Sequence, residues 1–438
     1  MATRFSVREH VVDASHIRDF ARATSTSQDA VLKLHVKQYL PLDNPAPRKG
    51  DVTIIGAHAN AFPKEIYEPL WDDLHQELGR HGLRIRAVWI ADCAWQGRSG
   101  VLNLRRGVLG NDPGWFDYAR DIVHLVNTFR MPRPLVAVGH SFGACALSHA
   151  ALLHPRLFHS LVLLDPVIAM FHEYSAALGM RPAAASIRRR DAWPSRSHAA
   201  ALLRKSPFCR SWDPRAFDRW IRFGLCSVDD DRDDHNDCDD RNDRDDHAHQ
   251  ADHAAAQVTL ATTRHQEVFT FLRPAWPAFD PRGERVVDPK RMPDCGTSLH
   301  VAMPMYPFYR AEPIATFARM ADLRPGVLFI VGGTSTVVPP PDVARRTDIT
   351  GTGLGGSGGV PAGRVRLVSH PDHGHLIPLE SPAFCAREAA AFLERELSLW
   401  AEEEQEYDEW ASRSADERTQ VSREWKAHLD MSKDRPKI

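Results

Sequence analysis

The strongest chemical signal in the chain is residues 139–143, which read Gly-His-Ser-Phe-Gly and fit the pattern G-x-S-x-G. An apolar run at residues 135–138 precedes it, and an alanine-rich segment with helical spacing follows it. A serine in this pattern between a strand and a helix is typical of a nucleophile elbow, a sharp turn that lifts the serine Oγ out of the sheet. Larger side chains at Gly139 and Gly143 would collide across such a turn. The pattern therefore predicts Ser141 as a nucleophile.

A serine nucleophile needs a histidine base, and the chain has 23 histidines. In folds with this elbow the base follows the acid in chain order and lies in the loop after the last strand. The last strand-like run is residues 365–368, and the loop after it contains His370, His373 and His375. We favour His375 because it follows a glycine and precedes an apolar turn into the final helix. His373 and His370 are the alternatives.

The acid that orients the base is less obvious. Its usual place is after the strand-like run at residues 327–331, where the chain reads Gly-Gly-Thr-Ser-Thr with Ser335 and no carboxylate. Asp342 follows three prolines, which predict a stiff extended segment that carries it away from the sheet. Asp165 directly ends the run at residues 161–164, on the rim that carries the nucleophile. We therefore predict Asp165 as the acid, with Asp342 as the alternative. The non-catalytic interpretation of Asp165 is that it caps a helix before Pro166.

Acyl transfer also needs two N–H groups that stabilise the oxyanion. The turn that presents the nucleophile supplies the backbone N–H of Phe142. The segment at residues 56–62 follows a strand-like run and is similar to an H-G-x loop, with Ala59 in place of glycine. The second donor is predicted to be the Asn60 backbone, with Ala59 as the alternative.

The elements that must position these residues alternate along the chain. Three segments show helical spacing, residues 69–78, 115–129 and 142–153. Short, nearly continuous apolar runs predict parallel strands covered on both faces: residues 52–57, 85–91, 135–138, 161–164, 327–331 and 365–368. Such alternation is typical of a doubly wound, mostly parallel α/β sheet. Residues 5–12 and 31–39 are candidates for leading antiparallel strands.

We divide the chain into a core formed by residues 1–169 and 326–400, an inserted helical cap or lid at 170–325, and a charged helical extension at 401–438. After Pro382 the pattern is helical to about Trp425. Within the cap, residues 229–246 include 11 Asp and 3 Arg and are predicted to form a disordered surface loop. The run lacks the Gly and terminal Glu of an EF-hand, so calcium binding is disfavoured. One apolar and aromatic cluster of the cap could line an acyl pocket or simply pack: Met303, Met305, Tyr306, Phe308 and Tyr309.

Composition excludes several classes of protein. The chain has 438 residues, and its 55 basic and 57 acidic residues give a net charge of −2, so no nucleic-acid partner is expected. No stretch approaches the roughly 20 apolar residues of a transmembrane helix. The N-terminus lacks the apolar region of a secretory signal. Seven scattered cysteines without a C-x-x-C pair predict neither a disulfide scaffold nor a structural zinc site, and favour an intracellular location.

Taken together, residues 58–65, 139–143 and 374–380 resemble the α/β-hydrolase superfamily. More narrowly, they resemble fungal α/β-hydrolases that include a peroxisomal lipase and toxin-biosynthesis hydrolases. The resemblance implies the α/β-hydrolase fold and a structural role for the turn at residues 92–100. Some members of this group carry a C-terminal peroxisomal signal. The chain ends Pro436-Lys437-Ile438, which keeps the basic and aliphatic positions of such a signal, so an import receptor is a candidate partner and the location is predicted as peroxisomal or otherwise cytoplasmic.

The predicted function is a serine hydrolase that cleaves a carboxylic ester or thioester of an apolar acyl substrate through an acyl-enzyme, in lipid or secondary (toxin) metabolism. The predicted mechanism requires no metal and no organic cofactor. The alternative is a non-catalytic binding protein that kept the fold, which the missing carboxylate near Ser335 would favour. Epoxide hydrolase or dehalogenase chemistry is disfavoured because it needs a carboxylate where Ser141 stands.

Overall fold

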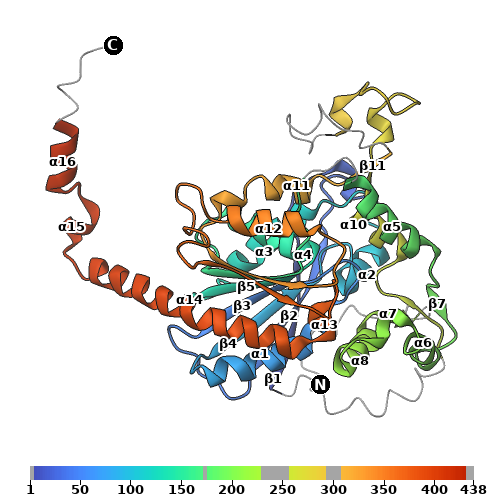
Figure 1. The fold of residues 1–438 in the computed structure, drawn as a ribbon, viewed down its shortest axis with the longest axis horizontal. Coiled ribbons are helices and arrows are strands. Elements are labelled where there is room, and N and C mark those ends of the chain that lie inside the picture. The colour runs from blue at the N-terminus through green and yellow to red at the C-terminus, as the bar shows by residue number, and fades with distance from the viewer. Residues whose placement is uncertain (1–3, 171–174, 228–255, 293–306, 431–438) are drawn as a thin grey trace.

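A single eight-stranded sheet forms the centre of the computed structural model, which describes residues 4–170, 175–227, 256–292 and 307–430 (Figure 1). Its strand order is β1-β2-β4-β3-β5-β6-β12-β13. The strands are β1 (Phe5–Asp13), β2 (Lys33–Pro41), β3 (Val52–Ala57), β4 (Ile85–Ala91), β5 (Leu135–His140), β6 (Ser160–Leu164), β12 (Gly326–Gly332) and β13 (Val365–His370). Strand β2 pairs antiparallel with both β1 and β4, whereas the pairings from β4 to β13 are parallel. The predicted mostly parallel sheet and its leading antiparallel strands are confirmed.

Helices cover both faces of the central strands, which is why β3, β5, β6 and β12 are buried along their whole length. Strand β13 lies at the edge of the sheet and exposes Arg366 and Leu367, which corrects the prediction that the run at 365–368 is covered on both faces. Ile54 and Ile55 of β3 are neighbours in sequence, yet they belong to separate buried clusters on opposite faces. The cluster of Ile54 includes Trp71 of α1 (Glu68–Arg80) and Leu393 of α14 (Pro382–Ala411). The cluster of Ile55 includes residues of α3 (Trp115–Thr128) and α4 (Phe142–Leu153).

Between β6 and β12 the described chain forms short helices and two small sheets. The helices are α5 (Ser175–Arg188), α6 (Arg196–Leu203), α7 (Pro207–Arg210), α8 (Pro214–Phe223), α10 (Arg264–Phe271) and α11 (Glu312–Phe317). The small sheets pair β7 (Ala192–Trp193), β9 (Val258–Leu260) and β8 (Leu225–Ser227), and β10 (Arg273–Pro274) with β11 (Phe308–Tyr309).

Some sequence predictions fall outside the described residues. These are the Asp-rich run at 229–246, Met303, Met305 and Tyr306 of the aromatic cluster, and the C-terminal tripeptide at 436–438. The other two members of the cluster, Phe308 and Tyr309, form strand β11.

The C-terminal helix is interrupted, which corrects the prediction of continuous helix to about Trp425. Helix α14 ends at Ala411, and α15 (Ala415–Thr419) and α16 (Arg423–Asp430) follow it away from the sheet (Figure 1). The cause is a capping box, in which Ser414 and Glu417 exchange hydrogen bonds between side chain and backbone and so begin a new helix. None of the helices in the described ranges is both long and apolar enough to cross a membrane.

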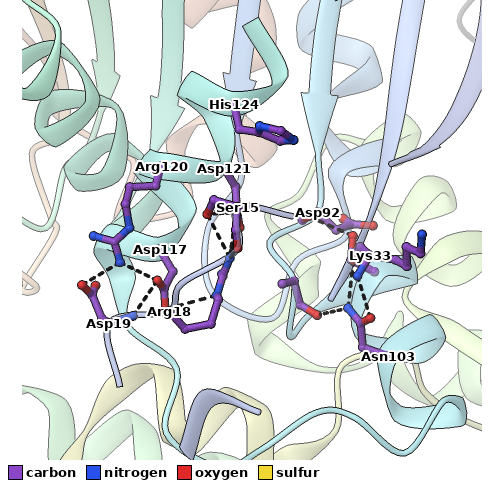
Figure 2. Close-up of polar contacts among 12 residues, drawn as sticks. Ser15, Arg18, Asp19, Lys33, Asp92, Asn103, Asp117, Arg120, Asp121 and His124 are labelled. Carbon is purple, nitrogen blue, oxygen red and sulfur yellow. Dashed lines mark hydrogen bonds and ion pairs between the residues drawn. The ribbon is translucent and has the colours of Figure 1, made fainter. Parts of the chain in front are cut away.

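The segment after β1 is fastened to α3 by buried ion pairs (Figure 2). Arg18 donates to both carboxylate oxygens of Asp121, at 2.8 and 3.0 Å, and its Nε lies 3.5 Å from Asp117. The Ser15 hydroxyl and backbone N–H donate to the same Asp121 carboxylate. Bidentate pairs of this kind fix geometry as well as charge. They hold α3, which packs on the helix that begins at the predicted elbow.

Candidate active site

Ser141 occupies the turn between β5 and α4 in a strained conformation. Its backbone has φ 60° and ψ −122°, a region that residues with a side chain rarely adopt. A Cβ at Gly143 would lie 2.4 Å from the His58 carbonyl oxygen, and one at Gly139 would lie 2.8 Å from the Ala144 Cα. The two glycines of the pattern are therefore required by close backbone approach, as the sequence predicted.

The structure brings Ser141, His375 and Asp165 into one hydrogen-bonded chain. His375 Nε2 lies 2.9 Å from Ser141 Oγ, and His375 Nδ1 lies 3.0 Å from Asp165 Oδ2. Because a carboxylate only accepts, Nδ1–H donates to Asp165, and Nε2 is left to accept the Ser141 hydroxyl proton. The three residues are 24 and 210 positions apart, and the loop ends of β5, β6 and β13 bring them together.

Asp165 sits just beyond β6 and is almost completely buried. Its φ of 40° turns the backbone sharply, and its N–H donates to the Ile330 carbonyl at 2.7 Å. Burial on its own would raise the pKa of this carboxyl group, but the hydrogen bond with His375 and the charge of that imidazole, with a further contribution from the Ser335 hydroxyl, outweigh it and lower the pKa. The residue at the usual position of the acid thus helps to lower the pKa of Asp165.

A buried arginine holds the segment that follows the acid. Arg346 lies in α12 (Pro340–Ile349), and its Nη1 donates to the carbonyls of Pro166 and Ile168 at 2.8 and 3.0 Å. The Val167 N–H donates to the carbonyl of Ser141 at 3.1 Å. Arg346 was not among the predicted site residues, because arginine is usually exposed and nothing in the local sequence marks it as buried.

The alternative histidines have other partners. His373 Nδ1 lies 3.3 Å from a carboxylate oxygen of Glu380. The His370 ring packs edge-on against Phe384, with 4.7 Å between ring centroids. Of the three histidines in this loop, only His375 is hydrogen-bonded to Ser141.

Asp342 is directed elsewhere, for a reason that differs from the predicted one. Residues 339–341 were expected to form an extended segment, but Pro340 begins helix α12. Proline is tolerated in a first helical turn because no N–H is needed there. Asp342 is buried in that turn and accepts a hydrogen bond from the Met170 N–H at 3.0 Å.

The backbone N–H groups of Phe142 and Asn60 are the candidates for an oxyanion hole. Phe142 is the first residue of α4, so its N–H precedes the hydrogen-bond ladder of the helix. The Ala59 N–H donates to the Tyr67 hydroxyl at 2.9 Å, whereas no described residue accepts a hydrogen bond from the Asn60 N–H. This favours Asn60 over Ala59 as the second donor; its role stays a proposal.

A buried relay joins this loop to the histidine loop. His140 Nε2 donates to the His375 carbonyl at 2.8 Å, so its Nδ1 accepts from the Tyr67 hydroxyl, also at 2.8 Å. The Tyr67 oxygen in turn accepts the Ala59 N–H. Burial, and then the neighbouring charge of His375, lower the pKa of His140 to about 3, so it stays neutral and the relay keeps this direction.

A buried cluster of ion pairs lies where the oxyanion loop ends, at Lys64 and Glu65. Lys64 has no exposed surface, and its ammonium lies 2.7 Å from Asp92 and 2.9 Å from Glu65. Burial by itself would lower the pKa of Lys64, but the two carboxylates outweigh it and raise the pKa. Burial would raise the pKa of Glu65, but Lys64 and Lys37 hold it at about 2, below its ordinary 4.5.

We predict that Lys64→Met lowers the free energy of unfolding by about 3–5 kcal/mol at pH 7, since it removes the ammonium group that lies between the buried carboxylates of Asp92 and Glu65 and leaves Asp92 without an ion pair among the described residues. Urea denaturation followed by circular dichroism measures the change. The control is Lys33→Met, which removes a surface pair with Asp13 and should cost less than about 1 kcal/mol. Because the lowered pKa of Glu65 stabilises the fold above pH 4.5 and this is lost as the pH falls through 2, the difference from wild type should shrink over that window. A variant as stable as wild type would contradict the buried pairing.

The chain is similar to a protein family, to curated proteins and to solved structures. A family model described as "Alpha/beta hydrolase family" matches residues 54–388. The type I acyl-CoA thioesterase mpaH of Penicillium roqueforti is 36% identical over 441 residues, covering 99% of this chain and 95% of that protein. The abhydrolase domain-containing protein AFT2-1 of Alternaria alternata is 27% identical over 270 residues, covering 61% of this chain and 85% of that protein. Among solved structures, the peroxisomal alpha-beta-hydrolase Lpx1 of Saccharomyces cerevisiae has a similar fold, with a TM-score of 0.62 at 16% identity over 99% of this chain and 97% of that one.

Proposed function

Because the chain belongs to the alpha/beta hydrolase family, we propose that it is a serine hydrolase that cleaves acyl thioesters through an acyl-enzyme. One observation carries the proposal. The Ser141 hydroxyl, the His375 imidazole and the Asp165 carboxylate form a continuous hydrogen-bonded chain at the ends of three strands. This is the arrangement in which a base activates a serine and an acid orients the base.

In the first half of the reaction, Ser141 Oγ attacks the carbonyl carbon of the substrate while His375 Nε2 takes the hydroxyl proton. The negative charge that develops on the carbonyl oxygen is stabilised by the N–H groups of Phe142 and Asn60, each donor contributing about 3 kcal/mol. Asp165 stays ionised and stabilises the imidazolium. The tetrahedral intermediate then collapses, the bond to sulfur breaks, and His375 returns the proton to the leaving thiolate.

The second half repeats these steps with water. His375 removes a proton from a water molecule, whose oxygen attacks the acyl carbon of the ester at Ser141. The same two N–H groups stabilise the second oxyanion. Collapse of this intermediate breaks the bond to Ser141 Oγ, which recovers its proton from His375, and releases the carboxylic acid. No atom beyond substrate, water and these side chains is needed for balance.

The relatives favour a thioester over an oxygen ester as the substrate class. The relative that covers nearly the whole chain is named an acyl-CoA thioesterase, and it matches this chain from the core through the inserted segment. The acyl chain, and a place in lipid or secondary metabolism, stay predictions from sequence. A peroxisomal location likewise stays a prediction, carried by the last three residues.

We predict that the protein hydrolyses medium- or long-chain acyl-CoA with a kcat/KM at least about tenfold above that for the p-nitrophenyl ester of the same acid, a difference of about 1.4 kcal/mol in transition-state binding. Release of free thiol, measured with a chromogenic disulfide, gives the rate. A fluorophosphonate probe that labels wild type but not Ser141→Ala provides the independent check. A protein that is neither labelled nor active on any member of the panel would favour the alternative, a binding protein that kept the fold.

A further inference from the structure

Gln96 contacts both the proposed oxyanion loop of the core and helix α10 of the inserted segment. Its side chain is completely buried and its amide makes three hydrogen bonds. Oε1 accepts the Ala61 N–H at 2.8 Å, and Nε2 donates to Asn60 Oδ1 at 2.6 Å and to Thr270 Oγ1 at 2.8 Å. One side chain thus contacts two consecutive residues of the loop and a helix about 175 positions away along the chain.

The contacts of Thr270 fix which way the Gln96 amide points. The Thr270 hydroxyl donates to the Gln266 carbonyl at 2.8 Å, so towards other groups it can only accept. It accepts from the Trp95 indole N–H and from Gln96, both at 2.8 Å. Nε2 of Gln96 therefore faces Thr270, and Oε1 is left to face the Ala61 N–H.

The side chain of Asn60 is held from the other side as well. Its Oδ1 accepts from Gln96, and its Nδ2 donates to the Glu267 carbonyl of α10 at 3.0 Å. Asn60 is buried, so both ends of its amide are satisfied within the protein. The residue whose backbone N–H is the proposed oxyanion donor is thus tied to α10 through its own side chain.

The loop needs such a restraint because it is strained. Ala61 has a φ of 70°, and the left-handed region costs a residue with a Cβ about 1–2 kcal/mol. Relaxation of that residue would rotate the peptide group next to Asn60. The hydrogen bond from the Ala61 N–H to Gln96 opposes this relaxation.

We propose that Gln96 is a positioning residue that holds the Asn60 N–H towards the oxyanion, and that α10 of the inserted segment is part of the same support. The inference rests on the proposed function and extends it. Helix α10 is then part of the rigid support of the active site. Its hydrogen bonds to the loop affect turnover, although the helix does not contact the substrate.

The test uses Thr270→Val, which removes the hydroxyl that anchors Gln96 and lies outside the reacting groups. We expect kcat on an acyl-CoA thioester to fall about 10- to 100-fold, with KM within about twofold of wild type, because a small misplacement of a donor weakens only transition-state binding. Affinity for an alkyl trifluoromethyl ketone, whose serine adduct carries an oxyanion, should fall by the same factor. Thr270→Ser restores the hydroxyl and should recover most of both losses.

Two further variants complete the design. Asn60→Ala keeps the backbone N–H but removes the link to Gln96 and α10, so it should reproduce the loss and covers the case in which Thr270→Val does not fold. Thr347→Val is the matched control, since its buried hydroxyl also donates to a carbonyl four residues earlier and does not contact the loop.

Wild-type kcat and ketone affinity in folded Thr270→Val and Asn60→Ala would overturn the inference, as would a loss of kcat with unchanged ketone affinity. A wild type that neither hydrolyses thioesters nor binds the ketone would instead overturn the proposed function.

Discussion

Ser141→Ala should lower turnover of acyl-CoA by about 10⁴- to 10⁶-fold while the protein stays folded, because the reaction then loses its nucleophile and only binding and oxyanion stabilisation remain. The variant removes one oxygen atom from a turn whose conformation is imposed by surrounding backbone, so the strand and helix on either side should be unaffected. Thiol release under saturating substrate gives the rate, and thermal unfolding checks the fold.

His375→Ala tests the same proton transfer by removing the base. The loss should be as large as that of Ser141→Ala, and the double variant should be no worse than either single one, since the two groups act in one proton transfer. His373→Ala is the matched control, because it lies two residues away in the same loop and pairs with Glu380. Turnover near wild type in His375→Ala, with a large loss in His373→Ala, would show that the base had been assigned to the wrong histidine.

The sheet and the elbow could be predicted because their signals are local. A strand covered on both faces is apolar at nearly every position, and the runs in β3, β5 and β6 meet that condition without knowledge of their neighbours. The elbow needs small residues beside Ser141, and the reason is a contact with the His58 and Ala57 carbonyls that any residue larger than glycine would violate. A short pattern was therefore enough to predict the turn that holds Ser141.

The groups that hold the site could not be predicted, because their signals are tertiary. Gln96 lies in a turn that sequence analysis interpreted as structural, and only the folded chain shows that it contacts Asn60 and α10. Arg346 is in a helix that was not predicted at all, and its buried guanidinium is explained by carbonyls that are about 180 positions away. Buried polar contacts of this kind depend on partners distant in sequence, so composition and periodicity do not reveal them.

Two predictions about helix ends were wrong because competing local signals were present. Charged helical periodicity continues past Ala411, yet the Ser-x-x-Glu signature at 414–417 caps a separate helix. The prolines at 339–341 were read as a stiff extended segment, whereas two of them occupy the first turn of α12. In the first case the capping signature was not considered, and in the second the prolines were placed outside a helix whose first turn two of them help to form.

Asp165→Asn should lower kcat by about 10²- to 10⁴-fold, because an amide neither stabilises the imidazolium nor selects the Nδ1–H tautomer of His375. Asp342→Asn is the comparison: its carboxylate accepts from the Met170 N–H, so turnover of the folded variant should stay near wild type. A further variant uses Ser335, in the loop after β12, whose hydroxyl helps to lower the pKa of Asp165. In the double variant Asp165→Asn, Ser335→Asp, a carboxylate stands at the usual position of the acid, in the loop after β12, and we expect part of the lost kcat to return. Rates of thiol release for the four proteins between pH 5 and 9 measure this. Equal kcat in wild type and Asp165→Asn would show that Asp165 does not act on His375, and a double variant no faster than Asp165→Asn would show that residue 335 cannot take its place.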